Sequence, residues 1–209
     1  LLLLLNNDIF YEFIKVEEFL KGNLARISLK DVELNVNYLL IISTSAGLWS
    51  YNIGDTIKFT SLEPFRIIVT GRIKHFLSAF GEHVISEEVE KAMEAATKLH
   101  NVAIREFTVA PNINPKEMLP HHEWYVEFES LPKDMLAFSK ALDKEMTRLN
   151  IYYKDLIDGK ILKSLEVISV EIGGFNKYMK SVGRLGGQNK VPRLSNDRKI
   201  VDKLKTLNS

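Results

Sequence analysis

The sequence predicts an α+β fold in which short strands fill the first third and helices alternate with strands after it. Residues 9–14 and 65–69 are short runs rich in β-branched and aromatic residues, which are typical of buried strands. From Met135 to Leu149, by contrast, apolar residues recur at spacings of three and four, the period of an amphipathic helix. The boundary between the two patterns is predicted at residues 71–74.

Four further runs in the first third are predicted as strands. The leucines at 1–5 are far fewer than the roughly 20 apolar residues that span a membrane, and a buried strand is predicted there instead. Residues 32–42 alternate apolar and polar and then become continuously apolar, which indicates one strand that passes from a half-exposed to a buried setting. Residues 48–51 and 56–59 predict two separate strands, with turns that hold Gly54 and Pro64.

The remainder predicts alternating helices and strands. Ser86 is expected to cap a helix with Val89, Ala92, Met93 and Ala96 on its apolar face, and Pro132 to begin the Met135–Leu149 helix. The strand at 122–129 is predicted to be half-buried, with Trp124 inside and Tyr125 outside. The other expected elements are strands over 102–109 and 165–170, a short helix from the Gly173-Gly174 break to Met179, and a last helix capped by Ser195 or Asn196 with Ile200, Val201 and Leu204 buried.

The composition indicates a folded protein and argues against several classes of partner. Apolar residues make up 45% and charged residues 26% of the 209, which are globular values. The 28 basic and 27 acidic residues give a net charge of +1, so no long-range attraction to nucleic acid or to a membrane is expected. The sequence contains no cysteine, which rules out disulfides and cysteine metal ligands and fits a cytoplasmic location.

Two short segments place residues suited to nucleotide binding behind glycines. Asp55 follows Gly54 directly, and the segment 71–75 holds Arg72 and Lys74 behind a second glycine. A carboxylate can accept hydrogen bonds from two vicinal hydroxyls, and a guanidinium can bind a ribose oxygen or a phosphate.

A third segment, residues 186–193, is a glycine-containing loop that presents Lys190. Glycine has unusual backbone freedom, so a loop of this kind suits a part that must move. Together the three segments predict a nucleotide site that is divided between two domains and closed by a mobile lid.

These segments, with 7–14, 80–84 and 187–198 in the same order, resemble the auxin-responsive (Gretchen Hagen type) acyl-acid amido synthetases, in particular their bacterial branch, within the acyl-adenylating superfamily. The resemblance covers nearly the whole chain. It implies that residues 1–73 are the β-rich end of a larger N-terminal α/β domain and that 74–209 form a mobile C-terminal α+β lid domain. It also implies that a Ser/Thr/Gly-rich phosphate loop lies upstream, because these 209 residues contain none. The chain alone is therefore expected to be inactive.

The resemblance assigns roles to the nucleotide-site candidates. The family's Tyr-x-x-Gly-Asp pattern matches Tyr51, Gly54 and Asp55, with Asp55 on the ribose hydroxyls. Arg72 is implied as a second nucleotide contact. Without the resemblance, the favoured interpretation of Asp55 is a turn aspartate, and Arg72 is open to interpretation as half of a surface ion pair.

The lid candidates also take their roles from the resemblance. Lys74 stands at the superfamily's hinge position, and Lys190 matches the catalytic lysine that reaches the reacting carboxylate and the α-phosphate. Gly81 would let the lid backbone approach substrate closely, although a simple turn explains it equally well. Both lysines are also open to interpretation as ordinary exposed lysines. The stem of the Lys190 loop holds Gly183, Gly186 and Gly187.

The implied reaction uses ATP and Mg²⁺ to adenylate a small-molecule acyl acid and then passes the acyl group to an amine, with an amino acid as the expected acceptor. Two alternatives stay open. One is an adenylating enzyme with a thiol acceptor, and the other is a non-catalytic small-molecule-binding or interaction module on the same fold. The second is kept open by Ser50, where bacterial relatives usually have arginine, and by the missing phosphate loop. The chain also departs from those relatives at Lys15, where they tend to have proline.

No metal site is predicted within the chain itself. The run His121-His122-Glu123 contains metal-ligand residue types, but adjacent side chains in a strand point to opposite faces and do not converge. Glu12, between aromatic residues, is interpreted as a structural acid.

Overall fold

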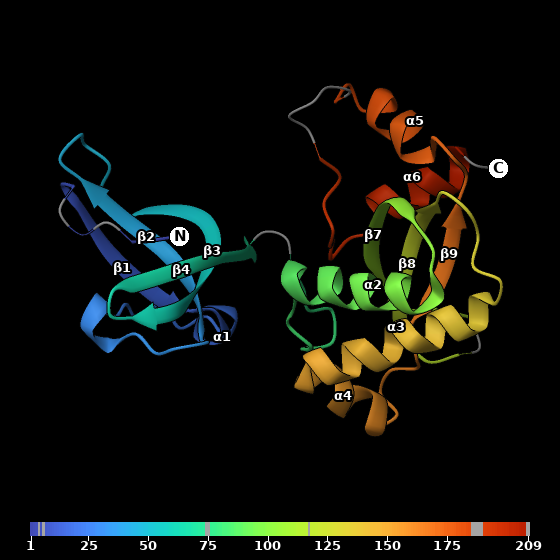
Figure 1. Ribbon diagram of the computed structural model, residues 1–209, viewed down its shortest axis with the longest axis horizontal. Coiled ribbons are helices and arrows are strands. Elements are labelled where there is room, and N and C mark those ends of the chain that lie inside the picture. The colour runs from blue at the N-terminus through green and yellow to red at the C-terminus, as the bar shows by residue number, and fades with distance from the viewer. Residues whose placement is uncertain (4, 6, 74–75, 117, 185–189, 208–209) are drawn as a thin grey trace. The chain divides into compact units, whose positions relative to one another are not determined.

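The computed structural model describes residues 1–209 except 4, 6, 74, 75, 117, 185–189, 208 and 209. The chain forms two compact units, Leu1–Lys74 and His75–Ser209 (Figure 1). Helices and strands occur in both, which confirms the predicted α+β class. None of the helices among the described residues is both long enough and apolar enough to cross a membrane.

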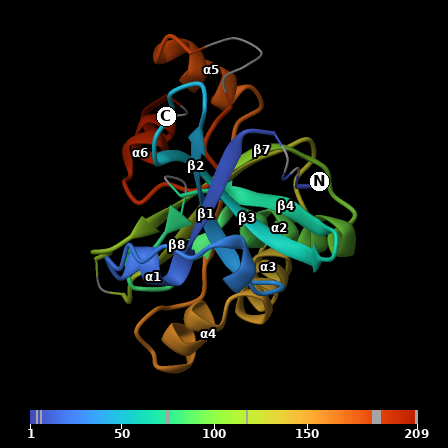
Figure 2. The ribbon, with the colours of Figure 1, turned by 90° about the vertical axis from the view of Figure 1, so that its left-hand side faces the viewer.

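The first unit is an antiparallel sheet with the strand order β1-β2-β3-β4 (Figure 2). Its core is built from the rings of Phe13, Tyr38 and Phe59, which are fully buried and meet edge to face at centroid distances of 5.3 to 6.0 Å. The elements are β1 (Ile9–Lys15), α1 (Val16–Leu20), a short 3₁₀ helix (Leu29–Asp31), β2 (Asn37–Thr44), β3 (Tyr51–Leu62) and β4 (Phe65–Arg72).

The strand predicted over 32–42 begins late, and the leucine run is not a buried strand. The strand β2 starts only at Asn37, because Asn35 adopts a left-handed backbone (φ 62°) that an extended strand cannot contain. Of the leucines that the structure describes here, Leu3 is buried and Leu1 and Leu5 are exposed, and Leu2 forms an isolated bridge with Arg66 of β4.

Gly54 lies inside a strand, whereas a turn was predicted there. The two strands expected on either side of it are one twelve-residue strand, β3. Two residues of β2, Leu39 and Ile41, face Thr56 and Asn52 of β3, so β3 carries extra residues at this point. Gly54 takes the positive φ (83°) that such a bulge favours. The predicted turn at Pro64 is confirmed, because it joins β3 to β4.

The second unit has a three-stranded sheet in the order β7-β8-β9, with β7 antiparallel and β9 parallel to β8. A two-stranded ribbon precedes it. The elements are β5 (Phe76–Leu77), β6 (Val84–Ile85), α2 (Ser86–His100), β7 (Ile104–Asn112), β8 (His121–Phe128), α3 (Met135–Leu149), α4 (Ile151–Asp158), β9 (Glu166–Val170), α5 (Gly174–Ser181) and α6 (Lys199–Leu207).

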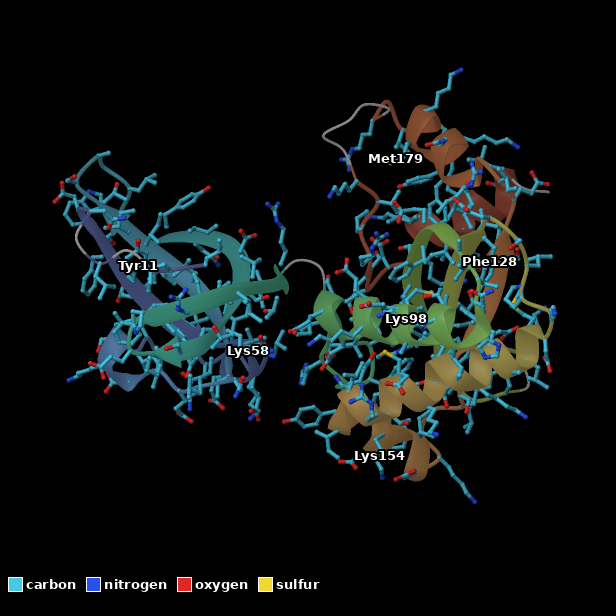
Figure 3. All side chains as sticks on the ribbon, viewed as in Figure 1. Tyr11, Lys58, Lys98, Phe128, Lys154 and Met179 are labelled. Carbon is cyan, nitrogen blue, oxygen red and sulfur yellow. The ribbon has the colours of Figure 1, made fainter. Side chains whose placement is uncertain are left out.

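Helices cover both faces of this sheet. Trp124 of β8 packs in a cluster with residues of α2 and α3, whereas its neighbour Tyr125 packs with residues of α5 and α6. All eight residues of β8 are therefore buried, and the predicted half-buried strand is wrong on this point. Phe128 of β8 is buried, whereas the Lys98 side chain of α2 is 75% exposed; both residues are labelled in Figure 3.

Helix α3 is confirmed over its predicted range Met135–Leu149, but the predicted cap of α2 and the predicted beginning of α3 at Pro132 are wrong. Ser86 is the first helical residue of α2 rather than its cap, and the Ile85 N–H donates instead to the Glu88 carboxylate (3.0 Å). Asp134 caps α3, where Pro132 was expected to begin it. Helix α4 was not predicted, and the side chain of Asn150 caps it.

Candidate functional site

The first half of the predicted site is an ion pair across the hairpin of β3 and β4. Asp55 lies opposite Arg72 in the strand register, and the Arg72 Nε is 3.0 Å from the Asp55 Oδ1. The Asp55 side chain is 28% exposed and that of Arg72 is 66% exposed. A pair this open contributes little to stability, so both groups can turn to a ligand at small cost.

The backbone around this pair is held in place by hydrogen bonds. The Ile73 N–H donates to the carbonyl of Gly54 at 2.8 Å, which closes the bulge against the end of β4. On the buried side, the Thr70 hydroxyl donates to the Thr56 hydroxyl at 3.0 Å. These hydrogen bonds hold the backbone that carries the two side chains of the pair.

The guanidinium of Arg26 contacts Ser50, although the two residues are far apart in the sequence. Arg26 donates to the Ser50 hydroxyl at 2.8 Å and to the Glu12 carboxylate at 3.0 Å. Glu12 is thus one partner of a surface ion pair. Tyr51, at the start of β3, is half exposed, and Trp49 beside it is 82% exposed.

In the second unit, Lys190 is exposed and lines a hollow of about 250 Å³ together with Arg105, Glu127 and Met179. Glu127 of this lining is buried, and its carboxylate accepts the N–H groups of Gly173 and Phe175 at the start of α5 (2.8 and 3.2 Å). Gly183 has a positive φ of 67°. The predicted Gly186 and Gly187, and the predicted hinge Lys74, lie outside the described residues.

Gly81 lies in a bend that a buried contact between Glu82 and His122 supports. Gly81 is exposed with a φ of 90°, while the neighbouring Glu82 is fully buried. The Glu82 carboxylate accepts the Phe80 N–H at 2.8 Å and lies 2.8 Å from His122 Nε2. The ring of His122 stacks on those of Phe80 and Tyr153. The bend is therefore attached firmly to β8.

Electrostatics keep this buried carboxyl charged. Burial opposes ionisation of Glu82, but the hydrogen bond and charge interaction with His122, together with backbone N–H groups, outweigh burial and hold the pKa of Glu82 below its ordinary value. Sequence reasoning missed this pair because its members are 40 positions apart. An acid beside a turn glycine was the only signal available.

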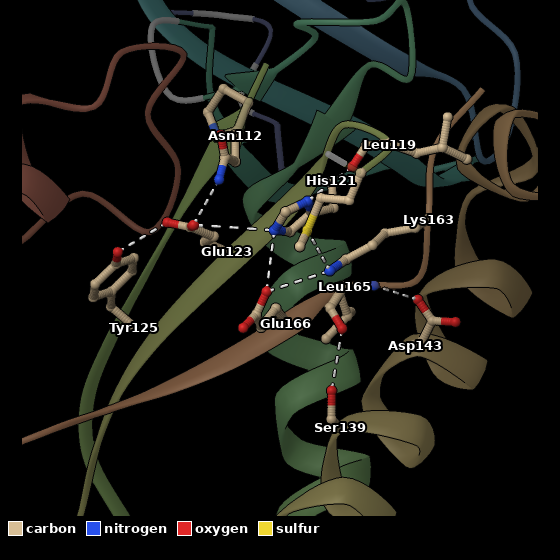
Figure 4. A network of polar contacts seen from close by, with 12 residues as sticks. Asn112, Leu119, His121, Glu123, Tyr125, Ser139, Asp143, Lys163, Leu165 and Glu166 are labelled. Carbon is tan, nitrogen blue, oxygen red and sulfur yellow. Dashed lines mark hydrogen bonds and ion pairs between the residues drawn. The ribbon is translucent and has the colours of Figure 1, made fainter. Parts of the chain in front are cut away.

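The two adjacent histidines of β8 point to different surroundings, because neighbouring residues of a strand face opposite sides of the sheet. The His121 Nε2 lies 3.2 Å from Glu166 Oε2 and 4.0 Å from Glu123 Oε1 (Figure 4), whereas His122 contacts Glu82. Glu123 is buried, and Arg198 donates to it at 2.7 Å. Within the described ranges of the chain, no group of three histidine or carboxylate side chains could hold a metal ion.

The residues predicted for one site thus fall into two units. Tyr51, Asp55 and Arg72 belong to the first, and Gly81 and Lys190 belong to the second. The structure brings Asp55 and Arg72 into contact.

Solved structures share this fold. The structure of GH3.15 acyl acid amido synthetase matches 94% of the chain with a TM-score of 0.70 and 22% sequence identity, and the chain covers 37% of it. The fold is therefore that of part of an acyl acid amido synthetase.

The chain belongs to the GH3 family. The model of the GH3 family central domain matches residues 2–72, and that of the GH3 family C-terminal domain matches residues 87–199. The chain is 28% identical over 183 residues to indole-3-acetic acid-amido synthetase GH3.4 of Arabidopsis thaliana, covering 80% of the chain and 30% of that protein. It is 26% identical over 215 residues to indole-3-acetic acid-amido synthetase GH3.3 of the same plant, covering 95% of the chain and 35% of that protein.

The family resemblance is thereby confirmed, while the bacterial branch stays a prediction. The chain spans about a third of the length of these relatives.

Proposed function

We propose that this chain is the central and C-terminal part of an ATP-dependent acyl-acid amido synthetase. The observation that carries the proposal is the ion pair between the half-buried Asp55 and the exposed Arg72 on the β3–β4 hairpin, within the matched central domain. In the reaction, the carboxylate of an acyl acid attacks the α-phosphate of ATP and releases pyrophosphate. An amine then attacks the acyl carbonyl, and AMP leaves. An amino acid is the proposed amine, and the proposed setting is the cytoplasm.

The chain's own residues supply positioning and charge. Asp55 would accept hydrogen bonds from the ribose hydroxyls, and Arg72 would bind a ribose oxygen or a phosphate. Together these contacts would hold the nucleotide in position for in-line attack. Lys190 would meet the negative charge that develops on the α-phosphate. ATP and Mg²⁺ are the proposed cofactors, as the family resemblance implies.

The proposal is tested by pyrophosphate exchange into ATP, measured on the full-length protein with a panel of acyl acids that includes indole-3-acetic acid. Exchange that depends on the acid, followed by an amide product when amino acids are added, is expected. The 209-residue chain alone is expected to give only background, because it has no Ser/Thr/Gly-rich loop to hold the β- and γ-phosphates. Product formed only with a thiol would favour the thiol-acceptor alternative, and binding without exchange would favour a non-catalytic module.

Replacing Asp55 with alanine is expected to weaken AMP binding to the full-length protein by about 1–3 kcal/mol, the range for losing hydrogen bonds to a charged group. Calorimetric titration measures this. Asp31→Ala is the matched control, because Asp31 is also exposed in the first unit and accepts a hydrogen bond only from Ser28 within the described contacts. Equal affinity of a folded Asp55→Ala variant and the unaltered protein would rule out the ribose role.

Lys74 is proposed as the hinge of the lid from the resemblance alone. Proline fixes φ, so Lys74→Pro should restrict rotation there and impair one half-reaction more than the other. Single-turnover rates of adenylation and of amine transfer, measured separately, test this. Equal slowing of both steps, or of neither, would place the hinge elsewhere.

A further inference from the structure

The segment that follows Lys190 is bound along the edge of the sheet. The strand β7 is an edge strand, and Val109 in it donates its N–H to the carbonyl of Arg193 at 2.9 Å. The Ser195 N–H donates back to the Val109 carbonyl at 3.0 Å, which makes a parallel bridge at Leu194. The backbone just after Lys190 is therefore part of the sheet's hydrogen bonding.

Two further contacts hold residues that lie between Arg193 and Lys190 in the sequence. The Thr108 hydroxyl, in a fully buried side chain, donates to the carbonyl of Pro192 at 2.7 Å. Val191, the residue next to Lys190, is buried in the cluster formed with α5 and α6. Each residue from 191 to 195 thus contacts the body of the second unit.

Arg193 contributes the strongest set of side-chain contacts. Its guanidinium lies over the Phe107 ring, 4.5 Å from the centroid, and donates to the Phe107 carbonyl at 3.1 Å. It also forms ion pairs with Glu106 of β7 and with Glu90 of α2 (3.3 Å). Stacking, hydrogen bonding and charge pairing on two elements leave this planar group one well-defined position.

We infer that Arg193 is a positioning residue for Lys190. The chain spans at most about 3.6 Å per residue, so the anchor at Arg193 confines the Lys190 backbone to within about 11 Å of it. The contacts at Pro192 and Val191 restrict the position of the Lys190 backbone further. The inference rests on the proposed function, in which the Lys190 cation must stand at the α-phosphate. A small misplacement of such a group costs a large factor in rate.

The test measures single-turnover formation of the acyl-adenylate by the full-length protein at saturating ATP and acid. Arg193→Ala is expected to slow it by roughly 10- to 100-fold with AMP affinity unchanged, because the nucleotide candidates lie in the other unit. Arg193→Lys should recover part of the loss, since it keeps the charge but not the planar fork. Arg148→Ala, which removes an exposed arginine paired with Glu145 on α3, is the control and should match the unaltered protein.

A double variant decides whether Arg193 acts through Lys190. If it does, Lys190→Ala combined with Arg193→Ala should be no slower than Lys190→Ala alone. Equal slowing by Arg193→Ala with and without Lys190 would overturn the inference while leaving the proposed function intact. Absence of acid-dependent adenylation in the unaltered protein would overturn both.

Thr108→Val provides a second test of the positioning of Lys190 if Arg193→Ala fails to fold. Valine fills the same volume and removes only the hydroxyl that binds the Pro192 carbonyl. Slower adenylation that again depends on Lys190 supports the inference, and an unchanged rate overturns it.

Discussion

Replacing Lys190 with alanine in the full-length protein is expected to slow acyl-adenylate formation by roughly 100- to 1,000-fold, the range for removing one group that stabilises developing charge. A cation aimed at that charge acts mainly in the transition state, so the affinity for ATP should change far less than the rate. Single-turnover adenylation and equilibrium nucleotide binding, measured on the same variant, separate the two quantities.

Lys203 offers a matched control for this experiment. It is an exposed lysine of α6 in the same unit, and Lys203→Ala removes the same charge from the surface. Adenylation should be unaffected by Lys203→Ala. An intact adenylation rate in Lys190→Ala would remove Lys190 from the mechanism and leave the hollow beside α5 without a catalytic group.

The second large effect concerns the core of the second unit. Leu142 of α3 is fully buried in the cluster that includes Trp124 and Met146. Leu142→Ala is expected to lower the free energy of unfolding by about 2–5 kcal/mol, because it removes buried methyl groups and leaves a cavity. Leu136→Ala makes the same substitution on the same helix at a side chain that is 65% exposed, and should cost no more than about 0.5 kcal/mol.

Denaturant unfolding of the 209-residue chain measures both changes through Trp124 fluorescence. Trp49 is the other tryptophan, so a Trp49→Phe background isolates the signal from the second unit. Similar losses in the two leucine variants would contradict the expectation that burial sets the contribution of Leu142, because helix propensity alone favours alanine over leucine.

Local patterns predicted the parts of the fold that depend on nearby residues. Helix α3 is an example, because its apolar residues repeat with the period of the helix itself and its length follows from that repeat. Helix starts were predicted less well. Side-chain caps such as Asp134 and Asn150 compete with other polar residues close by, and sequence spacing alone does not decide between them.

Part of the candidate site was also within reach of the sequence. Residue types, neighbouring glycines and the family resemblance indicate Asp55, Arg72 and Lys190 as candidates. The residues that hold these candidates in place are not predictable in this way. Arg193 reaches Glu106 across 87 positions, and Glu82 meets His122 across 40, and no local pattern reports such contacts.

By itself, the sequence determined the α+β class, the family, and which residues are candidates for nucleotide chemistry, because periodicity, composition and short motifs are properties of neighbouring residues. Only the tertiary structure decided that β8 is buried on both faces, since this depends on α2 and α3 covering one side and α5 and α6 the other. It likewise decided that Gly54 bulges within a strand, because the facing strand β2 sets the register there. The anchor of Lys190 is of the same kind, as it exists only where residues 191–195 meet the edge of β7.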